Sequence, residues 1–346
     1  MDKKPLVSII IPNFETPFED FLLCMNSISE QTYSNWECVI IDDGSSTEYK
    51  KQYELLSENS SIRIIEKKNE GPSAARNTGI RESTGDLVCF CDADDLLKPD
   101  FLSEAVDSVL QHDLDLFVGG TEVLVGNEVS LVHKSNTEGL RIVDFTQRDE
   151  LIDFTLAAKS TNKTSYLGNI LLGRVYPKLM SYDLVEKVLF EKPISIHEDN
   201  LWSIEIFEFA NRIGISDQIY YSYKINPYSI THKSYKKSNL TKEIKFAEIV
   251  IQRYFEQYPN ATKVRLLDVF IGIVNILSVL KLDSDETKKY LKDILIIFQS
   301  MNIDFNSLKS VNLSKYKSII ITILNLKNIS LKILLLNLLI YYKRLK

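Results

Sequence analysis

Apolar and polar positions alternate in blocks through the first hundred residues. Four short runs of mostly apolar residues, each followed by polar or turn residues, are typical of buried strands: 6–11, 37–41, 62–66 and 87–91. Helix-like stretches lie between and after these runs, at 19–31, 48–59, 73–82 and beyond Pro99. This alternation of strand and helix predicts an α/β fold with a mostly parallel sheet and helices on both faces.

The pattern changes twice further along the chain. Residues 114–118 and 122–132 predict two more strands, and a mixture of helix and strand follows in 184–190, 201–210 and 212–223. From about residue 240 the pattern is helical, most clearly in 249–255, 264–280 and 287–298. A Lys- and Ser-rich stretch at 234–239 leads us to expect two domains, residues 1–235 and a smaller helical domain of residues 236–346.

Composition excludes several classes of protein. Of 346 residues, 45% are hydrophobic and 25% charged, which argues against intrinsic disorder. A net charge of −6 does not favour a nucleic-acid partner, which usually selects a basic protein. Four cysteines are too few for a disulfide scaffold, and the first apolar run, broken by Pro12, is too short for a secretory signal. We therefore expect a cytoplasmic protein.

Charge is unevenly distributed, because the segment 313–346 holds seven Lys or Arg residues and no Asp or Glu. The segment is also very apolar, but polar residues interrupt it too often for a spanning helix of about 20 apolar residues. Two interpretations remain open. The segment forms a helix pair packed into the C-terminal domain, or it lies on the inner face of an anionic membrane, with apolar side chains in lipid and basic ones at the headgroups.

Polar clusters directly follow the four N-terminal strands, at 12–14, 42–45, 69–71 and 92–95. The carboxyl ends of parallel strands share one edge of a sheet, where ligands bind. No GxGxxG or GxxxxGK[ST] motif is present, so dinucleotide and P-loop sites are excluded. Asp92 and Asp94 suit a hard divalent cation that bridges to phosphates, or they cap a turn before Pro99. A metal-bound nucleoside diphosphate fits this edge, with Asp43 free to accept a base N–H.

These motifs resemble those of family 2 glycosyltransferases with a GT-A fold. The resemblance covers about residues 5–100, through VSIIIPNF, WECVIIDDGSS, NEGPSAARNTGI and GDLVCFCDADD in this order. A looser match, YPKLM followed by FEKPISIHEDNLW, extends it to about residue 205. Beyond about residue 235 no motif carries it further.

The resemblance implies a role for each matching position. Pro12 and Phe14 would line the nucleotide base, Phe14 standing where the family more often has Tyr. Asp43 would hydrogen-bond the uracil, with Asp42 supporting its loop. Asn69 and Arg76 would contact the nucleotide and its phosphate or sugar. Asp92 would approach the ribose or the metal, and Lys178 would lie near the donor or acceptor.

The same resemblance implies the metal ligands and the catalytic base. Asp94 would be the principal ligand of Mn²⁺ or Mg²⁺, joined by Asp92 and by His232 from a C-terminal loop. Asp199 would take the proton from the acceptor hydroxyl, a role compatible with capping the helix that follows it. One base suffices for an inverting transfer, unlike a hydrolase that flanks the bond with two carboxylates.

The expected function is the metal-dependent, inverting transfer of a sugar from a UDP-sugar to a glycan or lipid-linked saccharide, in bacterial capsule or cell-surface polysaccharide synthesis. Two alternatives stay open. A phosphotransferase could use an Asp-x-Asp nucleophile, but in haloacid-dehalogenase-type enzymes that motif follows the first strand, whereas here it follows the fourth. A non-catalytic nucleotide-sugar-binding module would be expected to lack the base or the metal ligands.

Overall fold

The computed structural model describes the chain except for residues 1–3, 57–58, 158–165, 192–195, 226–235, 281, 301, 311–314 and 345–346. Contacts within the chain divide it into two compact units. The first comprises Met1–Thr155 and Asn162–Ser229, and the second comprises Leu156–Thr161 and Ile230–Lys346.

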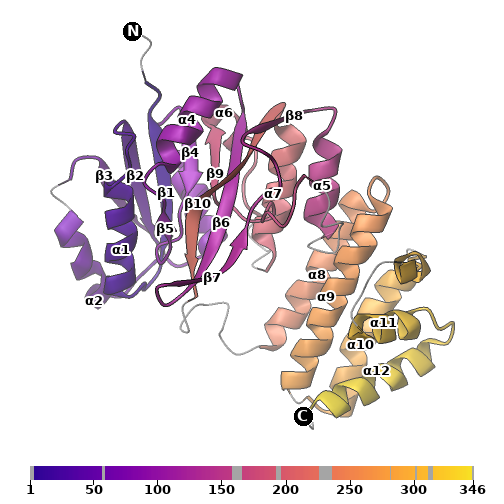
Figure 1. The fold of residues 1–346 in the computed structure, drawn as a ribbon. Helices are drawn as coiled ribbons and strands as arrows, with labels where there is room; N and C mark the ends of the chain where they lie inside the picture. Colours follow the sequence, from indigo (N-terminus) through magenta and orange to yellow (C-terminus); the bar gives the residue numbers. More distant parts are fainter. Residues whose placement is uncertain are drawn as a thin grey trace. The chain divides into compact units, whose positions relative to one another are not determined.

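A ten-stranded sheet forms the centre of the first unit, with strand order β3-β2-β1-β4-β9-β6-β10-β5, while β7 pairs with β6 and β8 pairs with β10 (Figure 1). The strands are β1 (Val7–Asn13), β2 (Trp36–Asp42), β3 (Ile62–Glu66), β4 (Leu87–Phe90), β5 (Leu96–Leu97), β6 (Leu116–Val125), β7 (Glu128–His133), β8 (Arg141–Asp144), β9 (Lys178–Ser181) and β10 (Arg212–Lys224). The first four strands confirm the predicted runs to within two residues at each end.

The sheet is mixed rather than mostly parallel. Strands β1 to β4 run parallel to one another, and β10 runs parallel to β6. Between these two groups β9 pairs antiparallel with both β4 and β6. The single strand expected over 122–132 is also wrong, because the chain reverses at Gly126 (φ +62°) and β6 and β7 form an antiparallel hairpin.

The helices of the first unit are α1 (Phe18–Ser29), α2 (Thr47–Lys50), α3 (Pro72–Glu82), α4 (Phe101–His112), α5 (Arg148–Ala157), α6 (Tyr182–Val185) and α7 (Glu198–Phe209). The helix expected over 48–59 is only α2 followed by a 3₁₀ turn, η1 (Lys51–Leu56). Helix α3 packs closely on β1 and β2, because Gly79 has no side chain: a Cβ there would lie 2.2 Å from Ile10 Cγ2. This close packing fixes α3 beside the carboxyl ends of the strands.

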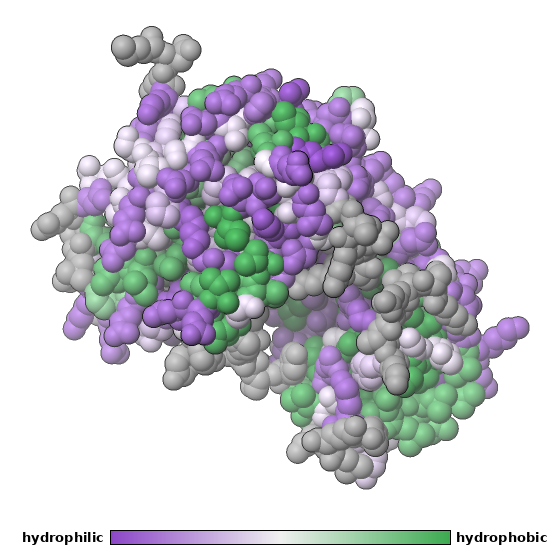
Figure 2. Space-filling model, in the orientation of Figure 1, coloured by the Kyte–Doolittle hydropathy of each residue, from purple (hydrophilic) through white to green (hydrophobic). Residues whose placement is uncertain are grey.

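The second unit is helical, as predicted from the pattern beyond residue 240. It contains α8 (Lys237–Tyr254), α9 (Pro259–Leu280), α10 (Ser284–Ser300), the 3₁₀ turn η3 (Asn306–Ser310), α11 (Lys315–Leu324) and α12 (Ile329–Arg344). Its core is formed by side chains such as Phe246, Phe270 and Leu291. Apolar side chains also gather on its surface over α11 and α12 (Figure 2). Within the described part of the chain, no helix combines the length and the apolar character needed to cross a bilayer.

Candidate active site

Arg76 lies at the centre of the candidate site and joins three segments that are distant in sequence. It lies in the first half of α3 and is 4% exposed. Its Nη2 donates to Asp92 Oδ1 at 3.0 Å, directly after β4, and its Nη1 donates to Asp199 Oδ1 at 3.1 Å, near the start of α7. Glu198 Oε1 lies 4.0 Å from Nη1. The structure thus brings together three residues that the sequence analysis proposed separately.

The surroundings of Arg76 keep it charged. Burial alone would lower the pKa of this guanidinium, but the carboxylates of Asp199, Asp92 and Glu198 outweigh burial and raise the pKa. The guanidinium carbon also lies 5.4 Å from the centre of the Phe190 ring. Arg76 is therefore a fixed positive charge facing carboxylates at the end of the sheet.

Aromatic packing holds the start of α7 next to Arg76. Asn77 bonds both the backbone N–H and the carbonyl of Phe190, each at 2.8 Å. The Phe190 ring stacks on Trp202 of α7, with centres 4.7 Å apart and planes at 6°. Trp202 in turn donates its indole N–H to the carbonyl of Val188 at 2.9 Å. These contacts position Asp199, three residues before Trp202.

The aspartates after β4 have different environments. Asp95 is fully buried and accepts hydrogen bonds from the Tyr221 hydroxyl and the Lys224 backbone, both at 2.8 Å, so it anchors the turn. Asp94 is partly exposed, and burial together with the charge of Asp92 raises its pKa to about 6. Two carboxylates that repel each other in this way are a suitable place for a cation.

The two aspartates at the end of β2 make internal contacts. Asp42 Oδ1 accepts hydrogen bonds from Ser45 N and Tyr53 Oη, both at 3.1 Å. Asp43 accepts from Lys67 Nζ at 2.7 Å and from Gly71 N at 2.7 Å. Asp43 therefore connects β2 to the segment before α3, and recognition of a uracil by Asp43 stays a prediction.

A close approach of two loops places Asn69 beside the end of β2. Gly44 has φ +85°, and a Cβ there would lie 2.8 Å from the backbone N of Asn69. Only glycine is compatible with both this backbone conformation and this contact. Asn69 itself is exposed, and so is Phe14, which follows β1 and presents an open aromatic face beside the partly exposed Pro12. These three side chains are accessible to a ligand, and their roles stay predictions.

Lys178 does not lie on the open edge. The side chain is 1% exposed, and its ammonium donates to the carbonyl oxygens of Leu172 (2.8 Å) and Arg174 and to Ser203 Oγ (3.2 Å). Burial lowers the pKa of Lys178 to about 7, although the charge of Asp199 opposes this effect. A direct contact with donor or acceptor, implied by the resemblance, does not fit an ammonium enclosed by protein acceptors. Lys178 instead lies within electrostatic reach behind Asp199.

The described residues do not form a complete metal site by themselves. Among the residues that the structure describes, no group of three or more His, Cys, Asp or Glu side chains could hold a metal ion. Asp92 and Asp94 remain as a pair, and His232 lies outside the described residues. A cation held by this pair would need further oxygen ligands, which the phosphates of a nucleotide supply.

Sequence reasoning missed two charged residues of the site. The half-exposed Arg174 places Nη1 3.7 Å from Asp199 Oδ2, whereas Arg76 contacts Oδ1. Glu198 precedes Asp199 at the start of α7, and burial followed by the charge of Asp199 raises its pKa. The HEDN sequence could have drawn attention to Glu198, but no pattern in the sequence pairs Arg174 with Asp199.

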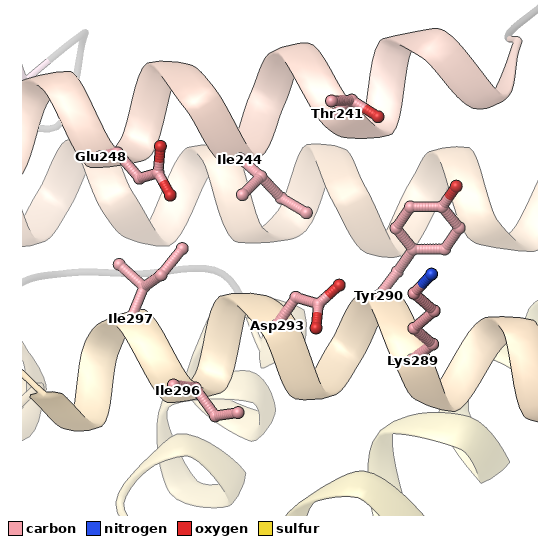
Figure 3. Close-up of a pocket in the computed structure, with 8 residues that line it drawn as sticks. All are labelled: Thr241, Ile244, Glu248, Lys289, Tyr290, Asp293, Ile296 and Ile297. Atoms are coloured by element: carbon pink, nitrogen blue, oxygen red, sulfur yellow. The ribbon is translucent and has the colours of Figure 1, made fainter.

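The second unit has an open groove between α8 and α10 (Figure 3). Its lining combines apolar side chains with carboxylates, one ammonium and one phenol: Thr241, Ile244, Glu248, Lys289, Tyr290, Asp293, Ile296 and Ile297. None of the residues predicted for sugar transfer lies in this groove.

Comparison with known proteins bears on the identity of the first unit. Residues 8–167 match the sequence model of Glycosyl transferase family 2. This segment of the chain therefore carries the sequence pattern of glycosyltransferase family 2. This result confirms the resemblance drawn from the order of the motifs after β1, β2, β3 and β4.

Two similar proteins are also named glycosyltransferases. EpsJ of Bacillus subtilis, named an uncharacterized glycosyltransferase, is 29% identical over 238 residues, which cover 67% of this chain and 64% of EpsJ. The glycosyltransferase GlyA of Streptococcus pneumoniae is 25% identical over 229 residues, 65% of this chain and 31% of GlyA. This chain thus spans less than two thirds of either relative.

The fold is shared with a solved structure along most of the chain. TarS of S. aureus, residues 1–349, superimposes with a TM-score of 0.63 at 18% identity, covering 94% of this chain and 89% of that one. The expected GT-A-type architecture followed by a helical region is therefore confirmed. At this identity the likeness concerns the fold and not the individual site residues.

Proposed function

We propose that this family 2 chain transfers a sugar from a UDP-sugar to a hydroxyl of a glycan or lipid-linked saccharide, with inversion at the anomeric carbon and with a divalent cation. The reaction would take place in the cytoplasm and serve the synthesis of a bacterial capsule or other surface polysaccharide. The observation that carries the proposal is the Arg76 cluster, in which a buried guanidinium lies between Asp92 after β4 and Asp199 at the start of α7.

Asp199 is the proposed general base. Its carboxylate lies at the second position of α7 and remains partly open to solvent. As the acceptor hydroxyl attacks the anomeric carbon, Asp199 would accept the hydroxyl proton while the bond to the diphosphate breaks on the opposite face. Glu198 is similarly exposed but lies 4.0 Å from Arg76, whereas both Arg76 and Arg174 hold Asp199 in place, so Asp199 is the better positioned base.

Positive charge for the departing diphosphate comes from arginine. Arg76 is held rigidly by Asp92 and Phe190, so its charge requires little reorganisation during the reaction. Arg174 is 47% exposed at its side chain and can reach an entering ligand. A diphosphate beside Asp92 would compete with Asp199 for the Arg76 guanidinium, which would leave Asp199 free to bind the acceptor hydroxyl.

The cation would be held by Asp92 and Asp94. The fit rests on Asp94, because burial and the neighbouring charge of Asp92 make its ionisation unfavourable without a cation. A bound Mn²⁺ or Mg²⁺ would supply Lewis-acid neutralisation of the diphosphate charge. The protein residues do the remaining work by fixing the base and the two arginines.

The donor is proposed to carry uridine. Solved structures of TarS residues 1–349 include complexes with UDP and with UDP-GlcNAc, so UDP-GlcNAc is the first donor to assay. On this chain the exposed Phe14 ring offers a face on which a pyrimidine base can stack.

The test measures UDP release and sugar transfer by the purified chain from UDP-sugars in the presence of Mn²⁺. Asp199→Asn should lower turnover by about 10²–10⁴-fold, the usual contribution of a positioned base, while UDP affinity stays nearly unchanged. Asp183→Asn, an exposed aspartate on α6, is the matched control and should retain activity. UDP binding without any turnover in wild-type protein would instead indicate a non-catalytic binding module, and full activity of Asp199→Asn would refute the assigned base.

A further inference from the structure

Helix α12 has one face packed into the second unit and one face exposed. Leu336 and Ile340 are buried, and the helix contacts α9, α10 and α11. On the other side Leu331, Leu334, Leu338 and Tyr341 are 42–60% exposed. The sequence predicts that this segment either packs into the C-terminal domain or lies on a membrane. One side of α12 is packed into the second unit, and this packing does not account for the exposed apolar side.

The exposed residues form a continuous stripe. Their spacing of three, four and three residues puts them on one face of the helix over about 15 Å of its length. Ile319 on the neighbouring α11 is also exposed, and Figure 2 shows apolar side chains gathered over these two helices. Single exposed apolar residues are ordinary, whereas a contiguous patch marks a surface that binds something.

Charge identifies the kind of partner. The segment 313–346 carries seven basic residues and no acidic residue, so it contributes +7 to a chain whose total is −6. Lys327 is exposed just before α12, whereas Lys332 lies toward the side of Leu336 and Lys317 is paired with Asp268. A partner for this face must therefore accept apolar side chains and also carry negative charge.

A second copy of the chain does not meet both requirements. A symmetric dimer through this face would bring each basic segment against its own copy, because a two-fold interface buries the same surface on both subunits. Like charges so juxtaposed oppose association. An anionic bilayer, in contrast, offers an apolar interior directly beneath negatively charged headgroups.

We infer that the stripe of α12, Leu331, Leu334, Leu338 and Tyr341, docks the protein on the surface of an anionic lipid bilayer. The helix lies parallel to the surface, its leucines enter the boundary between headgroups and acyl chains, and Lys327 extends to lipid phosphates. This surface is independent of the proposed sugar transfer. It would bring the protein to the same location as a lipid-linked acceptor.

The test is co-sedimentation of the full chain with vesicles of phosphatidylcholine and phosphatidylglycerol at 7:3, compared with pure phosphatidylcholine. Leu334→Glu/Leu338→Glu should lower the partition coefficient on anionic vesicles by about 100-fold, about tenfold for each half-exposed leucine. Leu110→Glu/Phe145→Glu, at two exposed apolar positions of the first unit, is the matched control and should bind like wild type. Circular dichroism checks folding, and Leu334→Ser/Leu338→Ser replaces the Glu pair if that variant unfolds.

A second variant tests the electrostatic contribution. Lys327→Gln should weaken binding to the anionic vesicles by about fivefold, and 0.5 M NaCl should weaken it at least as much. Equal binding of wild type and the Leu334/Leu338 variant, or equal binding to neutral and anionic vesicles, overturns the inference. A concentration-dependent dimer that the leucine variant abolishes, without vesicle binding by wild type, would assign the stripe to a second copy instead.

Discussion

Lys178→Met should remove a pH dependence of stability that the wild-type protein shows between pH 7 and 10.5. The Lys178 ammonium is enclosed by two carbonyl oxygens and Ser203, and burial lowers its pKa from an ordinary 10.5 to about 7. Within this window the unfolded chain binds a proton at Lys178 that the folded chain does not. The free energy of unfolding therefore rises with pH through the window, and below pH 7 the full cost of charging the buried amine is present.

The magnitude follows from the two pKa values. Each pH unit between them corresponds to about 1.4 kcal/mol, so the difference in stability between wild type and Lys178→Met should change by about 5 kcal/mol across the window. Methionine has no donor for the carbonyls of Leu172 and Arg174, and each unsatisfied acceptor costs about 1–3 kcal/mol. The variant should therefore be close to wild type near pH 7 and clearly less stable near pH 10.

Urea denaturation followed by tryptophan fluorescence measures this difference. Both tryptophans, Trp36 and Trp202, belong to the first unit, so the signal reports the unit that contains Lys178. Lys187→Met, at an exposed lysine nine residues away, is the control and should keep the wild-type pH dependence. A constant difference between wild type and Lys178→Met from pH 7 to 10.5 would show that the Lys178 pKa is not lowered, and the reasoning would fail.

Two further changes test the edge of the sheet. Asp94→Ala should weaken both Mn²⁺ and UDP binding. It should not lower the thermal midpoint at pH 8, because it removes a carboxylate whose ionisation burial disfavours. Calorimetry of UDP binding with and without EDTA tests this, and a UDP affinity of the wild type that does not depend on metal would refute the shared site. Gly44→Ala should destabilise the first unit by about 2–3 kcal/mol, and the control Gly139→Ala should destabilise it by about 1 kcal/mol. Gly139 has a similar positive φ, but a Cβ there would have no atom within 4 Å. Equal losses of stability in urea denaturation would contradict the contact with Asn69.

The edge that carries the candidate site was predictable from local sequence. The strands β1, β2 and β4 are largely buried and β3 is partly buried, so all four are rich in apolar residues. Single polar residues such as Ser8 and Glu37 lie within these strands, whereas a cluster of polar residues marks the strand end. For this reason Asn13, Asp42 and Asp92 could be placed near one edge of the sheet from the sequence alone.

Strand β9 shows where local reasoning ends. It has only four residues, and its role as a strand depends on antiparallel pairing with β4 and β6, about 90 and 60 positions earlier in the chain. Its first residue, Lys178, carries a charge that sequence reasoning expects at a surface or a ligand. The charge can be buried because the carbonyl oxygens of Leu172 and Arg174 accept hydrogen bonds from the ammonium. No sequence pattern near Lys178 predicts these hydrogen bonds.

The electrostatics of the site explain why the Arg76 pairing matters for the proposed reaction. Three carboxylates, those of Asp92, Glu198 and Asp199, lie within 4.0 Å of a single buried guanidinium, and Asp94 adds a fourth acidic group beside Asp92. Arg174 is a second cation at Asp199, but the set still carries more acidic groups than basic ones. A diphosphate entering this region would meet net negative charge, which opposes binding unless another cation accompanies it. The charges of the described residues therefore support the proposed divalent cation, and this support does not depend on a complete set of protein ligands for the metal.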